Sequence, residues 1–170
     1  MKAEELMITT SDVMVGDWVR ITIEGEKYPA VVNSIKLNTE EIGVSYLAAP
    51  GDWEDGEGYD EIEPIPLTEA ILKANGFEFI EAEKLINVRR SMCHLSRMSG
   101  EYRYVDKTKK GFVIDFIGLG YSGLHKEWQV IQMFGKDMVI DAGKANYVHQ
   151  LQHCLKICGI EKEITLKLEP

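Results

Sequence analysis

Short stretches with the pattern of β-strands, separated by turns, fill the first 66 residues. Residues 18–23, with the sequence WVRITI, alternate large apolar and polar side chains, as a strand with one buried face does. Gly16-Asp17 precedes this stretch and Glu24-Gly25 follows it, and both pairs are typical of turns. Residues 28–35, 41–47 and 59–65 have similar patterns. Four or five strands this short, with turns at short intervals, predict a small and strongly bent β-barrel.

A boundary between two domains is predicted at Pro64-Ile65-Pro66, which gives domains of residues 1–66 and 67–170. Residues 1–66 contain four Lys and Arg against fifteen Asp and Glu, a net charge of −11. Residues 67–170 contain fifteen against thirteen, a net charge of +2. Such asymmetry indicates two units that differ in their partners or in their solvation.

The second domain is predicted to combine a sheet with helices. Residues 67–76 form a short predicted helix, with Thr68 as its N-cap and Gly76 as its left-handed terminator. The main helix is predicted at about residues 143–158, with Asp141 as N-cap and Gly159 as stop. An antiparallel meander is predicted from strand patterns at residues 102–106, 112–117, 127–134 and 137–140, and a last strand at 163–168. The predicted fold class is α+β: an N-terminal β-barrel, then an antiparallel sheet packed with one main helix.

Composition excludes several classes of protein. An apolar fraction of 45% with 28% charged residues is typical of a globular domain, and no stretch approaches the ~18 apolar residues of a membrane span. The first ten residues hold two acids and no apolar core, so no signal peptide is predicted. Three cysteines, at positions 93, 154 and 158, are too few for a disulfide framework. A reducing cytoplasm is the predicted location.

The most enzyme-like motif is His149-Gln150-Leu151-Gln152-His153. Two histidines four apart on a helix begin the metal site of many zinc hydrolases, where a glutamate after the first His is the general base. Here Gln150 takes that place and cannot accept a proton in this way. Steps of about 100° per residue put both histidines opposite an apolar stripe made of Val148, Leu151, Leu155 and Cys158. His149 and His153 are therefore weak metal candidates, predicted to face solvent, and no cofactor is expected.

A basic segment runs from residue 84 to residue 110. Tyr102 and Tyr104 lie within it, and basic residues interleaved with aromatic ones can follow phosphates and stack on bases. The alternatives are a solvated surface, or a surface that docks the acidic barrel of the same or a second molecule. The overall acidity weighs against nucleic acid, because phosphate neutralisation supplies most non-specific affinity. The candidate nucleic-acid residues are Arg89, Arg90, Arg97, Arg103, Lys107, Lys109 and Lys110.

Two further motifs resemble known sites without matching them. The acidic loop at residues 52–63 resembles a calcium loop, but Glu57 stands where the sharp turn needs glycine. An exposed, mobile loop is predicted there, and Trp53 within it hints at a contact surface. Gly118, Gly120 and Gly123 have the spacing of a dinucleotide-binding loop, but no helix pattern follows, so residues 118–126 are predicted as a hairpin connection. The chain is therefore not predicted to be an enzyme.

Several segments resemble a family of short, uncharacterised proteins from gut anaerobic bacteria and their prophages or mobile elements. The resemblance rests on GDWV at residues 16–19, IEPIPLT at 62–68, ILKANGF at 71–77, YVHQLQ at 147–152 and GIEKEI at 159–164, together with the start MKAEEL. It covers the first half and the last quarter of the chain. The resemblance implies an N-terminal SH3-like barrel and a C-terminal α+β unit. It implies no assigned activity and no catalytic residues.

Three hypotheses for function follow. The leading one is a non-catalytic, cytoplasmic protein that binds another macromolecule, a protein, with self-association through an exposed barrel edge as a further option. The second is nucleic-acid binding through residues 84–110. The third is a metal-dependent hydrolase built on His149 and His153, which the missing general base disfavours.

Overall fold

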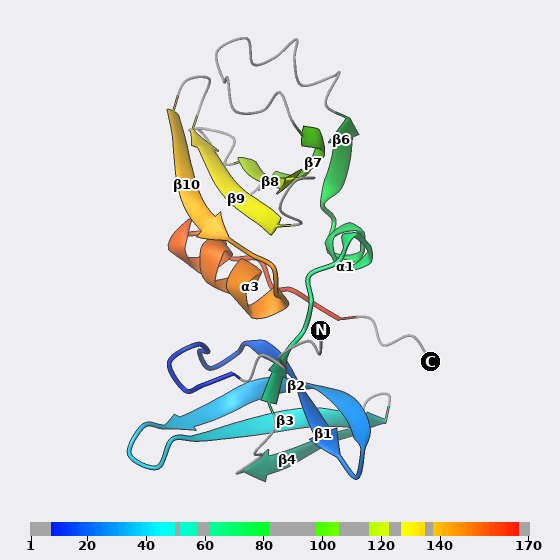
Figure 1. The fold of residues 1–170 in the computed structure, drawn as a ribbon, viewed down its shortest axis with the longest axis vertical. Helices are drawn as coiled ribbons and strands as arrows, with labels where there is room; N and C mark the ends of the chain where they lie inside the picture. The colour runs from blue at the N-terminus through cyan, green and yellow to red at the C-terminus, as the bar shows by residue number, and fades with distance from the viewer. Residues whose placement is uncertain are drawn as a thin grey trace, which may run out of the picture. The chain divides into compact units, whose positions relative to one another are not determined.

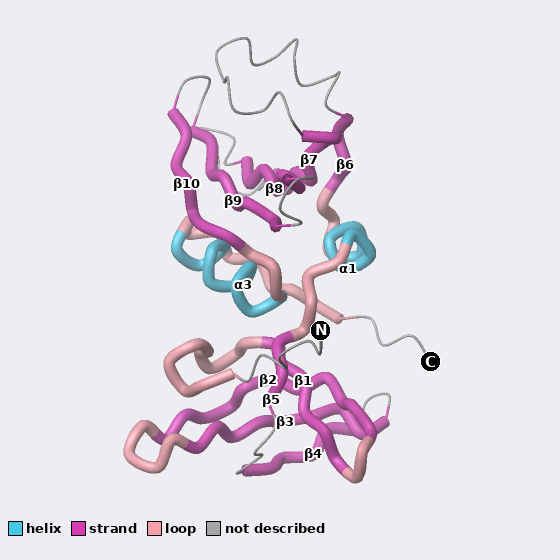
Figure 2. Tube along the Cα trace, viewed as in Figure 1, coloured by secondary structure: helices cyan, strands magenta, loops and turns pink. Residues whose placement is uncertain are grey.

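The computed structural model describes residues 8–49, 52–57, 62–81, 98–105, 116–122, 127–134 and 138–166. The chain is α+β, with mostly antiparallel sheet, and it divides into two compact units (Figures 1 and 2). The first unit is Met1–Pro66 with Tyr147–His149 and Pro170, and the second is Leu67–Asn146 with Gln150–Glu169. The division after Pro66 coincides with the boundary drawn from the sequence, apart from the residues near the C-terminus.

The first unit is a five-stranded antiparallel sheet in the order β4-β3-β2-β1-β5. Its strands are β1 (Trp18–Ile23), β2 (Glu26–Lys36), β3 (Glu41–Ala49), β4 (Asp52–Glu57) and β5 (Ile62–Pro64). Strands β1, β2, β3 and β5 fall in segments predicted as strands, β5 within residues 59–65. Within the described residues the edge strands β4 and β5 do not pair with each other, so the sheet is not closed into the predicted barrel.

Strand β4 contradicts the mobile loop predicted at residues 52–57. It pairs along β3, from Ala49 opposite Asp52 to Gly43 opposite Glu57. Acidic residues are poor strand formers, so composition alone favoured a loop. Cross-strand hydrogen bonds from Ser45 to Asp55 and from Tyr46 to Glu54 give the acids partners on β3.

One face of this sheet forms the core of the first unit. Val19 and Ile21 of β1, Val32 of β2 and Val44 of β3 are all fully buried. Because successive side chains in a strand point to opposite faces, this burial places Trp18 and Arg20 on the other face. The alternation seen in WVRITI therefore does separate a buried face from a face turned away from the core.

The second unit confirms the antiparallel meander. Its sheet has the order β10-β9-β8-β7-β6, and it consists of β6 (Glu78–Glu81), β7 (Met98–Val105), β8 (Phe116–Ser122), β9 (Glu127–Phe134) and β10 (Met138–Lys144). Strand β6 was not predicted. Gly118 and Gly120 lie inside β8, so the hairpin connection predicted at 118–126 is wrong for residues 118–122. Residues 163–166 of the predicted last strand form no strand.

Helices α1 (Glu69–Ala74) and α3 (Val148–Ile157) end in the same way. Gly76 and Gly159 have φ of +77° and +66°, the left-handed conformation that glycine adopts without strain. The amides of Phe77 and Ile160, one residue further on, donate to the carbonyls of Leu72 and Leu155 at 3.0 and 2.9 Å. The side chain of Thr68 accepts from Ile71 N at 3.3 Å, so the cap and both terminators predicted for the two helices are confirmed.

The predicted start of the main helix at residue 143 is wrong. Strand β10 continues to Lys144, with a bulge between Asp141 and Gly143, where Gly143 has φ +111°. Asp141 accepts from the amide of Gly143 at 2.9 Å, so its side chain shapes the bulge and does not cap the helix. The apolar stripe of the helix is confirmed, since its members are at most 9% exposed: Val148, Leu151, Leu155 and Cys158.

Asn75 joins helix α1 to the C-terminal segment of the second unit. Its side-chain amide donates to the carbonyls of Ile71 and Thr165 at 2.9 and 2.8 Å, and its Oδ1 accepts from Thr165 N at 2.8 Å. Asn75 is only 5% exposed. These bonds explain how residues near Thr165 are held without belonging to a strand.

We predict that Asn75→Ala lowers the free energy of unfolding by about 1–3 kcal/mol, because it removes the partners of buried backbone groups. Asn75→Asp keeps the acceptor and loses the two donated bonds, so its effect should be smaller. Urea denaturation measures both, with Asn38→Ala in an exposed turn as the control. Equal stability of Asn75→Ala and the control would contradict this role.

Candidate functional site

The two histidines of the enzyme-like motif do not form an exposed pair. His149 is 4% exposed, contrary to the prediction, and His153 is half-buried. The His149 ring stacks on Tyr147, with centroids 5.9 Å apart and planes within 4°. The helical projection did not indicate this burial, although both histidines lie in the one helix α3.

Gln150 has a structural function in the helix that carries the motif. Its Oε1 accepts a hydrogen bond from the backbone amide of Asn146 at 2.9 Å, just before the first turn of α3. The bond ties the third helical residue to the backbone two residues before the helix, and so holds the chain where it enters α3. Among the described residues, no three His, Cys, Asp or Glu side chains gather as a metal site.

The basic segment is described at only one of its seven candidate residues. Arg103 lies in β7, half-buried, opposite Glu78 of β6 and Gly118 of β8. The candidates outside the described residues are Arg89, Arg90, Arg97, Lys107, Lys109 and Lys110. The nucleic-acid hypothesis for this segment therefore stays a prediction.

The sequence suggested that Tyr102 could stack on bases, but its ring is not available for this. It is 1% exposed, and its ring contacts Phe79 and Trp128 at centroid distances of 5.1 and 5.8 Å. Its hydroxyl donates to Glu69 at 2.6 Å. Burial raises the pKa of Tyr102, and the same hydrogen bond lowers the pKa of Glu69. Tyr102 is thus a core residue of the second unit.

The two described cysteines, Cys154 of α3 and Cys158 just after its end, are buried free thiols. Burial raises the pKa of Cys154 to about 11, with a smaller contribution from Cys158. At neutral pH Cys154 is therefore a thiol and not the thiolate that nucleophilic catalysis requires. Its Sγ donates to the carbonyl of Ala142 at 3.4 Å, which fits a packing function.

The best candidate site is the side of the N-terminal sheet turned away from its core, here called the outer face. The strand register places Trp18 opposite Val31, Val31 opposite Ser45, and Ser45 opposite Asp55, so these four form a row across β1 to β4. The outer face as used below consists of Trp18, Arg20, Lys27, Val31, Asn33, Ser45, Trp53, Asp55 and Glu63.

Two tryptophans meet on the outer face. Strands β2 and β3 lie between β1 and β4, which carry Trp18 and Trp53. The two ring centroids are nevertheless 6.0 Å apart, with planes at 47°. Trp53 remains 47% exposed, which leaves a large aromatic surface open to solvent.

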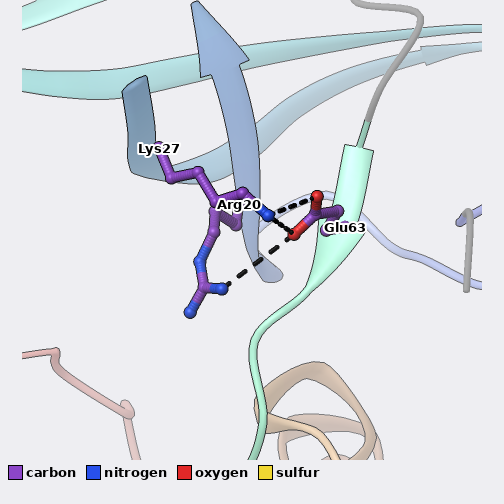
Figure 3. Close-up of polar contacts among 3 residues, drawn as sticks. All are labelled: Arg20, Lys27 and Glu63. Atoms are coloured by element: carbon purple, nitrogen blue, oxygen red, sulfur yellow. Dashed lines mark hydrogen bonds and ion pairs between the residues drawn. The ribbon is translucent and has the colours of Figure 1, made fainter. Parts of the chain in front are cut away.

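At the β5 side of the outer face one acidic side chain pairs with two basic ones. Glu63 accepts from Lys27 Nζ at 2.7 and 2.8 Å, and Arg20 lies 4.0 Å from the same carboxylate (Figure 3). One acid thus holds two basic side chains, from β1 and β2.

At the β4 side a carboxylate is held by polar neighbours alone. Asp55 Oδ1 accepts from Ser45 Oγ at 2.6 Å and from Asn33 Nδ2 at 3.4 Å. Asn33 Nδ2 also donates to Ser45 Oγ at 3.0 Å, so the three side chains form one small network. In the described part of the chain no basic residue pairs with Asp55, and its bonds all reach Oδ1.

A tight turn positions Trp18 at the start of β1. Asp17 is 3% exposed, and its Oδ2 accepts from the amide of Met14 at 2.7 Å. The backbone of Asp17 accepts from Val32 N at 2.9 Å, while Gly16 N donates to Val32 O at 2.7 Å. Gly16 has φ +95°, which a residue with a side chain rarely adopts. The sequence showed this turn, but not the tryptophan contact that depends on it.

Comparison with protein-family models, curated proteins and solved structures gives no match for this chain. In the described regions, no helix combines the length and apolar composition needed to cross a membrane.

We predict that Asp17→Ala lowers the free energy of unfolding by about 1–3 kcal/mol, because it removes a buried side chain that accepts from the amide of Met14. Asp17→Asn keeps an acceptor oxygen and should cost less. Urea denaturation gives the stability, and near-ultraviolet circular dichroism follows the tryptophan environment. Glu26→Ala, at an exposed position of the same unit, is the control. A near-ultraviolet spectrum and stability like those of the control would contradict the assignment.

Proposed function

We propose that this chain is a non-catalytic protein-binding protein, and that its N-terminal unit contacts a partner protein through the outer face. The observation that carries the proposal is the Trp18–Trp53 contact, with Trp53 half exposed on a sheet face. Tryptophan is enriched among the residues that dominate binding energy at protein interfaces. Charged and polar side chains at both sides of the rings supply a rim of the kind that interfaces have: Lys27, Glu63, Ser45 and Asp55.

The same proposal includes an SH3-like barrel for the N-terminal unit and a cytoplasmic location. The strand order supports the barrel, because β5 returns to pair with β1 at the far side of a four-stranded meander. The low cysteine content supports the location. Membership of the prophage and mobile-element family rests on the sequence resemblance alone.

Self-association through β4 is disfavoured by charge. Glu54 and Asp55 are both exposed on this edge strand. Two copies pairing there would bring like charges together, which is a common means by which edge strands avoid one another. The proposal is therefore binding of a different protein.

Selection from a library of displayed random peptides tests the proposal without knowledge of the natural partner. We expect the full chain to enrich a family of related peptides. Trp53→Ala should weaken their binding by more than about tenfold, as loss of a central aromatic residue does. Leu37→Ala removes an equally apolar side chain, 75% exposed, from the turn between β2 and β3, and should leave binding unchanged. No enrichment by the wild-type chain, or equal binding by Trp53→Ala, would refute the proposal.

A further inference from the structure

We propose that the outer face recognises an arginine side chain in a basic segment of the partner, with the guanidinium on the Trp53 ring and against the Asp55 carboxylate. This inference rests on the proposed function and names the chemistry of the partner.

The charge of the first unit indicates that the partner's binding segment is positively charged. Residues 1–66 have a net charge of −11, counted from the sequence. On the outer face, Arg20 and Lys27 are already engaged by Glu63, whereas Asp55 has no basic partner among the described residues. A partner that brings a positive charge to the β4 side therefore gains an ion pair and breaks none.

Trp53 and Asp55 are placed to act on one group. They are two residues apart on β4, so both point to the outer face with backbones separated by about 7 Å. A guanidinium is planar, stacks on aromatic rings and presents paired donors to a carboxylate. Trp53 offers the ring, and Asp55 offers Oδ2, the oxygen that Ser45 and Asn33 do not occupy. An ammonium group can use the charge but not the flat stacking on the ring.

The carboxylate is held in place before any ligand arrives. Ser45 and Asn33 both donate to Oδ1 of Asp55. These bonds orient the carboxylate and leave Oδ2 for a ligand. Fixing a side chain in advance reduces the entropy lost on binding. Ser45 is therefore a positioning residue, which acts on the ligand through Asp55.

The tryptophan geometry argues against an aromatic cage. The two ring centroids are 6.0 Å apart with planes at 47°, so the rings touch each other. A cation sandwiched between two rings needs space on both faces, which this contact does not leave. The cation must lie on the open surface of Trp53, where a flat guanidinium makes more contact than a trimethylated ammonium.

Fluorescence anisotropy with three labelled nonapeptides tests the inference. The peptides share a Gly-Ala backbone and carry three arginines, three lysines or three citrullines, the last being flat but uncharged. For the wild-type chain we expect the arginine peptide to bind at least about fivefold more tightly than the lysine peptide. The citrulline peptide should not bind detectably. Raising the salt concentration should weaken binding of the arginine peptide, because salt screens exposed charges.

Variants distinguish a specific arginine site from non-specific electrostatic attraction to the acidic unit. Asp55→Asn should lower the affinity for the arginine peptide about tenfold. Glu26→Gln removes the same charge elsewhere in the unit, and it should change that affinity less than about twofold. Ser45→Ala should weaken it about threefold and reduce the preference for arginine over lysine, a change that a loss of stability alone would not give. Equal effects of Asp55→Asn and Glu26→Gln, or equal binding of the arginine and lysine peptides, would overturn the inference.

The two proposals fail in different ways. If the peptide library yields binders that depend on Trp53 but lack arginine and are indifferent to Asp55→Asn, the protein-binding function stands and the arginine site is wrong. If neither the library nor the arginine peptide binds, both are wrong.

Discussion

One-sided burial of the N-terminal sheet determines what the rest of the first unit can present. Val19 and Ile21 are fully buried on β1. Because side chains alternate along a strand, Trp18 and Arg20 must lie on the opposite, outer face. A shift of one residue in the register would exchange these two sets, which would expose two aliphatic side chains and bury a guanidinium. The cost of that exchange fixes the register. The register in turn brings Trp18, Ser45 and Asp55 into one row.

Patterns within single elements could be predicted from the sequence. Strand β1 follows from the alternation in WVRITI, and the ends of both helices follow from Thr68, Gly76 and Gly159, because each acts on backbone groups within a few residues. Strand β4 could not be predicted in the same way. Its acids are acceptable in a strand only because Ser45 and Tyr46 on β3 supply hydrogen bonds, and that pairing is not visible in the local composition.

The candidate site was predicted only in fragments. Trp53 was noted as a hint of a contact surface, but within a segment expected to be a loop. Its contact with Trp18 joins residues 35 positions apart, across two intervening strands, and no local pattern indicates it. The two-histidine motif makes contacts within the fold. Gln150 satisfies the amide of Asn146 at the start of α3, and His149 is buried against Tyr147.

The acids of β4 serve two purposes that are usually treated as opposed. An exposed edge strand invites other chains to pair with it, and charge on that strand discourages pairing between copies. The same charge selects for a partner of opposite sign, so protection from self-association and choice of partner come from the same side chains. Asp55 does more than add to the net charge, because Ser45 and Asn33 orient it next to an exposed aromatic ring. A diffuse acidic surface would attract any cation alike. A carboxylate fixed beside Trp53 instead favours a cationic side chain that is flat enough to stack on the ring while it donates to Oδ2.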